Sequence, residues 1–244
     1  MAESILVGVD ASTPSRSAIR WSVSRALATG AALELLHVIV GETHDDAARL
    51  LHGELEFVRT LAPNLTVTTT LADGDAEDAF VRRSGRHSLL VVGTHKTGFI
   101  YGRAFGSRFL GLAARARCAV AFIPDQGGVV RRSVVAGVDS SPVGDAVIQF
   151  AAAEAERGGN ELTLVGNTRD ATARASQLVR ELHPELRFRT RVTELPLAEA
   201  LVDASTQSAL LVIGRPRTGS ASTVADNHDV LVNMGCPVMV LCIA

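Results

Sequence analysis

The feature that most constrains the fold is a repetition of the first half of the chain in the second half. The segment SVVAGVDSS, from Ser133, aligns with SILVGVDAS, from Ser4, and the match continues without a gap to Leu35 over Leu164. Two later matches pair SLLVVG at 88–93 with ALLVIG at 209–214, and CAVAFI at 118–123 with CPVMVL at 236–241. Because such recurrence indicates one structural unit used twice, we expect two copies of one domain, over residues 1–125 and 132–244, joined by a polar, glycine-containing linker.

Within the first copy, short apolar runs alternate with helical patterns. Strands are expected at residues 5–9, 32–40, 65–71, 89–92 and 119–123, and helices between Pro14 and Gly30, at 45–61, at 75–86 and from Ser107. An alternation of this kind implies a parallel sheet with right-handed crossovers. The predicted fold class is therefore α/β, with two tandem, doubly wound, five-stranded parallel-sheet domains.

Composition excludes several classes of protein. The 244 residues carry a formal net charge of −2, so the basic surface that nucleic-acid binding needs is not indicated. No apolar run approaches the roughly 18 residues of a membrane helix, and the first residues enter a strand without a basic leader segment. We therefore expect a cytoplasmic protein that binds neither nucleic acid nor membrane. The three cysteines do not form a disulfide framework and are expected to be buried thiols: Cys118, Cys236 and Cys242.

The stretch from 89 to 116, LLVVGTHKTGFIYGRAFGSRFLGLAARA, reads as a strand, a glycine-rich loop and a helix. Gly93 closes the strand and lets backbone approach a ligand, and a helix beginning at Gly106-Ser107 presents unpaired N–H groups that suit phosphate. Three cationic side chains lie in the same stretch: Lys96, Arg103 and Arg108. The alternative interpretation is an ordinary connection in which Ser107 is only a helix cap and the charges are solvated.

This stretch resembles the nucleotide loop of the universal stress protein family. ATP-binding members carry Gly, two residues, Gly, nine residues, and then Gly followed by Ser or Thr. Gly93 fits the first glycine and Gly106-Ser107 fit the closing pair, whereas Lys96 stands where the second glycine belongs. Lys96 therefore either supplies charge to the phosphates or obstructs them. The VGVDAS opening, the VVGT loop and the final CxV strand extend the resemblance over nearly the whole chain, which implies Rossmann-like domains of the adenine nucleotide alpha-hydrolase type.

The resemblance also implies a ligand and the residues that hold it. The ligand would be ATP, ADP or AMP, bound in the first copy, with Mg²⁺ carried by the nucleotide and no protein side chain as a metal ligand. Asp10 and its neighbours would lie on the adenine and ribose side, and Val38 would meet the adenine edge through its backbone. The alternative for Asp10 is a carboxylate that interacts with the helix dipole. The complete candidate site is Gly8, Val9, Asp10, Ala11, Val38, Gly93, Lys96, Arg103, Gly106, Ser107 and Arg108.

The second copy retains Gly214 but has no Gly-Ser pair in its loop. We therefore expect it to have lost ordinary ATP binding. Arg215 and Arg217 follow the glycine, and solvated arginines and an anion contact are both open interpretations.

The function predicted from these features is a nucleotide-binding regulator or stress sensor. The alternative is a protein-interaction module of the same fold that binds no nucleotide. An enzyme is not expected, because the sequence has no HxGH pair after the first strand, no SGGxDS and no GxxxxGK[ST], although slow ATP hydrolysis stays open. The last strands, AVAFI and PVMVL, are expected to be apolar edge strands, whose unpaired backbone groups must be shielded by another strand or segment. The resemblance implies that these two strands pair with each other, and further assembly into a homodimer stays open.

Overall fold

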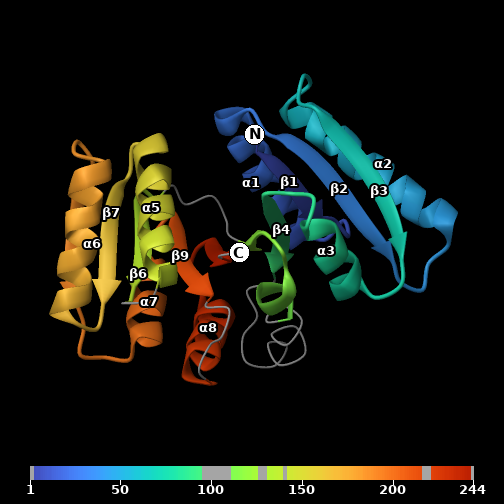
Figure 1. Ribbon diagram of the computed structural model, residues 1–244. Coiled ribbons are helices and arrows are strands. Elements are labelled where there is room, and N and C mark those ends of the chain that lie inside the picture. Colours follow the sequence, from blue (N-terminus) through green and yellow to red (C-terminus); the bar gives the residue numbers. More distant parts are fainter. Residues whose placement is uncertain (1–2, 95–110, 126–130, 140–141, 216–220, 243–244) are drawn as a thin grey trace. The chain divides into compact units, whose positions relative to one another are not determined.

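The structure is a computed structural model that describes residues 3–94, 111–125, 131–139, 142–215 and 221–242 (Figure 1). The chain divides into two compact units, Met1–Gln126 and Gly127–Ala244. The predicted helix start at Ser107 lies outside the described residues, and the described residues 111–115 are helical.

The first unit is a parallel sheet covered by helices. Its elements are β1 (Ser4–Gly8), α1 (Thr13–Thr29), β2 (Ala32–Ile39), α2 (His44–Leu61), β3 (Val67–Asp73), α3 (Ala76–Ser84), β4 (Leu89–Thr94) and β5 (Ala119–Pro124). The five strands lie in the order β3-β2-β1-β4-β5, and the pairs are parallel. Helices α1 and α2 pack against each other, whereas α3 packs against β1, β3 and β4. Right-handed crossovers to opposite sides of β1 place α1 and α2 on one face of the sheet and α3 on the other.

The second unit repeats this plan. Its elements are β6 (Ser133–Val138), α5 (Pro142–Arg157), β7 (Glu161–Gly166), α6 (Arg169–Leu182), β8 (Phe188–Val192), α7 (Leu197–Ser205), β9 (Leu210–Arg215), α8 (Ala221–Asn233) and β10 (Val238–Cys242). The strands lie in the order β8-β7-β6-β9-β10, which is the order of the first unit. The predicted fold class, two tandem doubly wound α/β domains, is confirmed.

The core of each unit is its central strands. Ile5, Leu6 and Val7 of β1 have no exposed surface, and Leu90 and Val91 of β4 are likewise fully buried. Consecutive buried residues are typical of a parallel strand with helices on both faces. Burial of each such side chain contributes about 1.5–3 kcal/mol to the free energy of folding, relative to the same side chain in water. This burial stabilises β1 in the middle of the sheet. Two of the expected buried thiols are buried, Cys118 and Cys236, whereas Cys242 is partly exposed.

The strand that differs most from its prediction is β3, which is displaced by two residues at both ends, whereas the other strands of the first unit differ by one or two residues at an end. A strand was expected at 65–71, but β3 runs from Val67 to Asp73. The Leu65 N–H donates to the carbonyl of Ala62 at 3.1 Å, which closes a turn after α2, so pairing with β2 begins only where the Leu33 N–H donates to Thr66 O.

The helix expected at 75–86 is shorter at both ends. Asp75 is the N-cap of α3 and accepts from the Asp78 N–H, and Gly85 is the C-cap. Gly74 has a φ of +100°, which the turn before the cap requires.

Candidate functional site

The first unit has a cavity at the carboxyl end of its sheet. The strand order reverses at β1, because β2 and β3 lie on one side of it and β4, reached from β3, lies on the other. Ligands of doubly wound proteins bind at such a switch point. The cavity has a volume of about 440 Å³, within the range of small-molecule sites. Five of the sequence-predicted site residues line it: Gly8, Val9, Asp10, Val38 and Gly93. The other predicted loop residues lie outside the described part of the chain: Lys96, Arg103, Gly106, Ser107 and Arg108.

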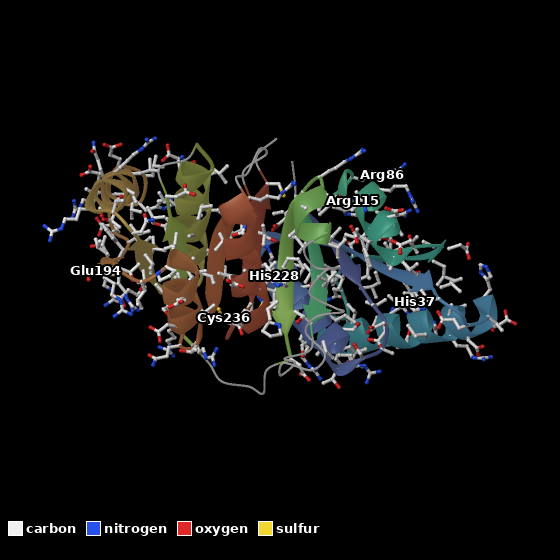
Figure 2. The ribbon with its side chains drawn as sticks, turned by 90° about the horizontal axis from the view of Figure 1, so that it is seen from below. His37, Arg86, Arg115, Glu194, His228 and Cys236 are labelled. Carbon is white, nitrogen blue, oxygen red and sulfur yellow. The ribbon has the colours of Figure 1, made fainter. Side chains whose placement is uncertain are left out.

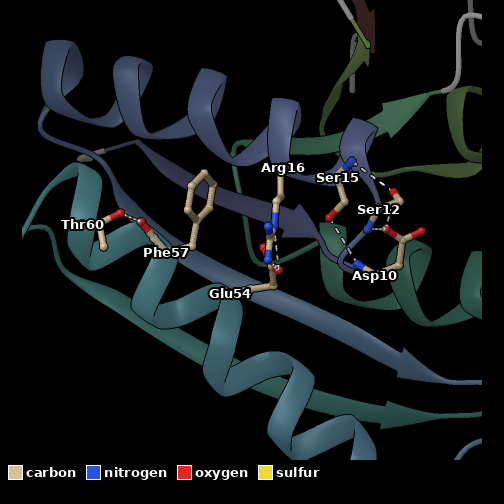
Figure 3. Close-up of polar contacts among 7 residues, drawn as sticks. All are labelled: Asp10, Ser12, Ser15, Arg16, Glu54, Phe57 and Thr60. Carbon is tan, nitrogen blue, oxygen red and sulfur yellow. Dashed lines mark hydrogen bonds and ion pairs between the residues drawn. The ribbon is translucent and has the colours of Figure 1, made fainter.

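The turn between β1 and α1 is fixed by its own polar groups (Figure 3). The Asp10 carboxylate accepts from the Ser12 N–H at 3.0 Å and from the Ser12 hydroxyl at 2.6 Å. Ser12 in turn caps α1 by accepting from the Ser15 N–H, and the Asp10 N–H donates to the Ser15 hydroxyl at 3.2 Å. Asp10 therefore holds Ser12, the residue that caps α1, and it also lines the cavity.

Ala11, in the middle of this turn, has a left-handed backbone with a φ of +60°. A residue with a Cβ pays about 1–2 kcal/mol for that conformation. The hydrogen bonds of Asp10, Ser12 and Ser15 hold it in place. Conformations of this kind cluster at ligand sites, where the surrounding structure imposes them.

Two glycines of the site lie in close contact with their neighbours. A Cβ on Gly8 would lie 2.7 Å from Cζ of Phe80, whose ring lines the cavity. A Cβ on Gly93 would lie 2.6 Å from the Ser15 backbone nitrogen and closer still to the Pro14 carbonyl group. Gly93 therefore lets the end of β4 approach the first turn of α1. The sequence pattern indicated only that the backbone comes close to something at Gly93, and it did not show whether the neighbour was a ligand or a helix.

His37 and Glu42 form a polar pair in the cavity wall. His37, labelled in Figure 2, lies at the end of β2 and is 5% exposed. Its Nδ1–H donates to the Val9 carbonyl at 2.7 Å, and its Nε2 lies 2.6 Å from Glu42 Oε1. Gly41, with a φ of +79°, turns the chain after β2 so that Glu42 returns to His37. Because the Val9 carbonyl can only accept, the hydrogen of that bond is on Nδ1, and Nε2 is the ring atom that meets Glu42.

The two ends of the cavity differ in chemistry. Near β2 the wall is apolar and is made by Val38, Val40 and Leu50, and Val40 is 70% exposed. On the opposite side, beside β4, Leu112 and Glu77 complete the wall.

The charge of Glu77 is compensated by Arg115, which is labelled in Figure 2. Arg115 donates to Glu77 Oε1 at 2.9 Å and to Asp78 Oδ1 at 2.6 Å. The hydrogen bond that Arg115 donates to Asp78, followed by the one that it donates to Glu77, raises the pKa of the guanidinium. A Cβ on Gly111 would overlap the Glu77 carboxylate, so the missing side chain lets the helical segment at 111–115 lie against α3.

The second unit keeps the frame of this site but changes its side chains. Gly166 pairs with Val138 at the end of β7, the position that His37 has beside Val9 in the first unit. Leu201 lies against Gly137 where Phe80 lies against Gly8. Within the residues that the structure describes, the second unit therefore has no counterpart of the His37–Glu42 pair.

Several cavity residues were not predicted from the sequence: Val40, Glu42, Leu50, Glu77 and Phe80. Each lies beyond a strand end or on a helix, so it belongs to no local motif. The only signal was Gly41, which indicates a turn that could bring Glu42 back toward the end of β2.

The strand order, the switch-point cavity and the capped left-handed turn define a Rossmann-like α/β protein whose first unit has a cavity of small-molecule size. The sequence profile of the Universal stress protein family matches residues 1–124. The chain belongs to this family, in its tandem two-domain form.

Similar proteins match this chain over most of their own length. A universal stress protein of Mycobacterium tuberculosis (strain ATCC 25618 / H37Rv) is 27% identical over 262 residues, which cover 98% of this chain and 96% of that protein. A universal stress protein of Mycolicibacterium smegmatis is 26% identical, with 86% of each chain covered. The crystal structure of a universal stress protein from Archaeoglobus fulgidus superposes with a TM-score of 0.80 at 16% identity, covering 99% of this chain and 96% of that one, and shows the shared fold.

None of the helices in the described ranges is long and apolar enough to cross a membrane.

Proposed function

We propose that the first unit binds an adenine nucleotide, ATP, ADP or AMP, and that the protein acts as a nucleotide-responsive regulator. The observation that carries this proposal is the cavity at the switch point of the first sheet, lined by Gly8, Val9, Asp10, Val38 and Gly93. A mostly apolar pocket with a few fixed polar groups is the usual form of a nucleotide site.

The lining residues fit the parts of a nucleotide in order across the sheet. The apolar wall of Val38, Val40 and Leu50 would cover the base, and it includes an exposed valine that otherwise faces water. Asp10, on the next strand, would accept from ribose hydroxyls. The phosphates would then lie beyond β4, toward the segment that carries Lys96 and the Gly106-Ser107 pair, and Mg²⁺ would be held by the phosphates.

The chemistry of the wall supports binding rather than turnover. Both ring nitrogens of His37 are engaged, by Val9 and by Glu42. The Glu77 carboxylate is paired with Arg115. His37 and Glu77 are therefore not free to act as a general base for water, which supports our proposal of a regulator rather than an enzyme.

Calorimetric titration with Mg·ATP and with AMP, together with chromatography of nucleotide released on denaturation, tests this proposal. Micromolar binding or copurified adenine nucleotide is expected for the wild type, with loss of binding in Gly106→Val. Val40→Asp should also weaken binding, because it places a charge in the base wall. Leu27→Asp is the matched control: Leu27 is 64% exposed on α1 and does not line the cavity.

The interaction-module alternative makes the opposite prediction. If neither copurified nucleotide nor heat with Mg·ATP is found, the cavity holds no nucleotide and the protein is a binding module of this fold. The pairing of the two last strands stays a prediction in either case.

A further inference from the structure

We propose that Glu42 selects the base, by accepting a hydrogen bond from the 6-amino group of adenine. This inference rests on the proposed function of the first unit and names the residue that would give that site its base specificity.

Glu42 lies at the end of the cavity where a base would bind. It lines the same wall as Val38, Val40 and Leu50, on the β2 side of β1. Gly93, on β4, lies on the other side of β1. Neighbouring strands are about 4.8 Å apart, so the two walls are separated by roughly 10 Å, the span of a base and its sugar. A base on the apolar wall therefore has its edge near Glu42.

The carboxylate of Glu42 is oriented before any ligand binds. Its Oε1 is held 2.6 Å from His37 Nε2, and His37 is itself fixed by the Val9 carbonyl. Oε2 has no hydrogen-bond partner among the described residues, and the side chain is only 32% exposed. One carboxylate oxygen is thus positioned, and the other is available to a ligand.

The chemistry of this oxygen discriminates between purines. A carboxylate only accepts hydrogen bonds, and the 6-amino group of adenine donates. A purine without that group leaves the carboxylate desolvated and unpaired when the base covers it. A hydrogen bond to a charged acceptor contributes more than a neutral one, so losing it should weaken binding about 10- to 100-fold.

The test compares AMP with purine riboside 5′-monophosphate, which differs only by hydrogen in place of the amino group. For the wild type we expect AMP to bind at least about 10-fold more tightly in calorimetric titration. Glu42→Ala should bind the two with nearly equal affinity, and Glu42→Gln, which keeps a neutral acceptor, should retain a preference of only a few fold. Asp45→Ala is the matched control, since Asp45 is exposed three residues further on, carries the same charge and does not line the cavity.

Equal affinity of the wild type for the two nucleotides would overturn this inference while leaving the proposed function intact. Full discrimination in Glu42→Ala would overturn it in the same way. Absence of binding of either nucleotide to the wild type would overturn the proposed function and this inference together. Tryptophan fluorescence of each variant checks that the first unit is folded.

Discussion

Replacing Gly93 with alanine should destabilise the first unit strongly, and the reason can be worked from the contacts. The added Cβ would meet the Pro14 carbonyl group and the Ser15 backbone nitrogen, the latter at 2.6 Å. Backbone atoms in the first turn of a helix cannot move aside as a side chain can. Overpacking of this kind costs about 1–3 kcal/mol, and we expect the upper end, about 3 kcal/mol.

The chain supplies a matched control for this substitution. Gly53 lies inside α2, and a Cβ there would have no heavy atom within 4 Å. Gly53→Ala should therefore stabilise the same unit by about 0.8–1 kcal/mol, because alanine is the better helix former. The same chemical change is thus expected to have opposite effects at Gly93 and Gly53.

Urea unfolding followed by tryptophan fluorescence measures both effects in one unit. The single tryptophan of the chain, Trp21, lies on α1, so its signal reports the first unit. With a slope of about 2 kcal/mol per molar urea, Gly93→Ala should lower the midpoint by about 1.5 M and Gly53→Ala should raise it by about 0.5 M. An unchanged midpoint for Gly93→Ala would refute the close packing of β4 on α1.

Three further predictions concern single residues. Burial would raise the pKa of Glu34, but hydrogen bonds from Thr70 and Arg83 outweigh it and hold the pKa below the usual value of a glutamate. This stabilisation is present above the ordinary glutamate pKa and is lost as the pH falls through the lower folded-state pKa, so Glu34→Gln should be less stable at pH 7. Its free energy of unfolding should also fall less on acidification, as urea midpoints across pH would show. Burial raises the pKa of Cys236 to about 12, so at pH 8 a thiol reagent should label Cys242 in the folded protein and Cys236 only in urea, which peptide mass spectrometry would detect. Ala11→Gly should stabilise the first unit by about 0.5 kcal/mol in urea titration, because relief of the left-handed strain exceeds the added freedom of the unfolded chain; a lower midpoint would contradict the strain.

The sequence alone was sufficient for the fold, because its signals are periodic and occur twice. A single short apolar run such as that of β1 could belong to a buried strand or to a buried helix. The same run recurs in β6 within the same order of elements, which favours the strand in both places. Strand boundaries were less predictable than the strands themselves. β3 begins later than predicted because the Leu65 N–H donates to the Ala62 carbonyl in a turn and is not available to pair with β2.

The site could be predicted only where it follows a strand. Asp10 and Val38 come at strand ends, which parallel topology brings to one edge of the sheet. Glu42 lines the cavity because the chain turns at Gly41, and Phe80 lines it because α3 packs on the sheet. Neither residue belongs to a sequence motif that would have identified it. Gly93 shows a further limit, since the spacing identified the residue but its neighbour, the first turn of α1, emerged only in three dimensions.

The left-handed turn at Ala11 has a kinetic consequence. Its hydrogen bonds are made within the chain by Asp10, Ser12 and Ser15, so the turn has its shape without a ligand. A small molecule that contacts this turn meets backbone groups that are already oriented, and little chain entropy is lost on association. We therefore expect stopped-flow binding at this edge of the sheet to follow a single exponential whose rate rises linearly with ligand concentration, with no slow step of local ordering.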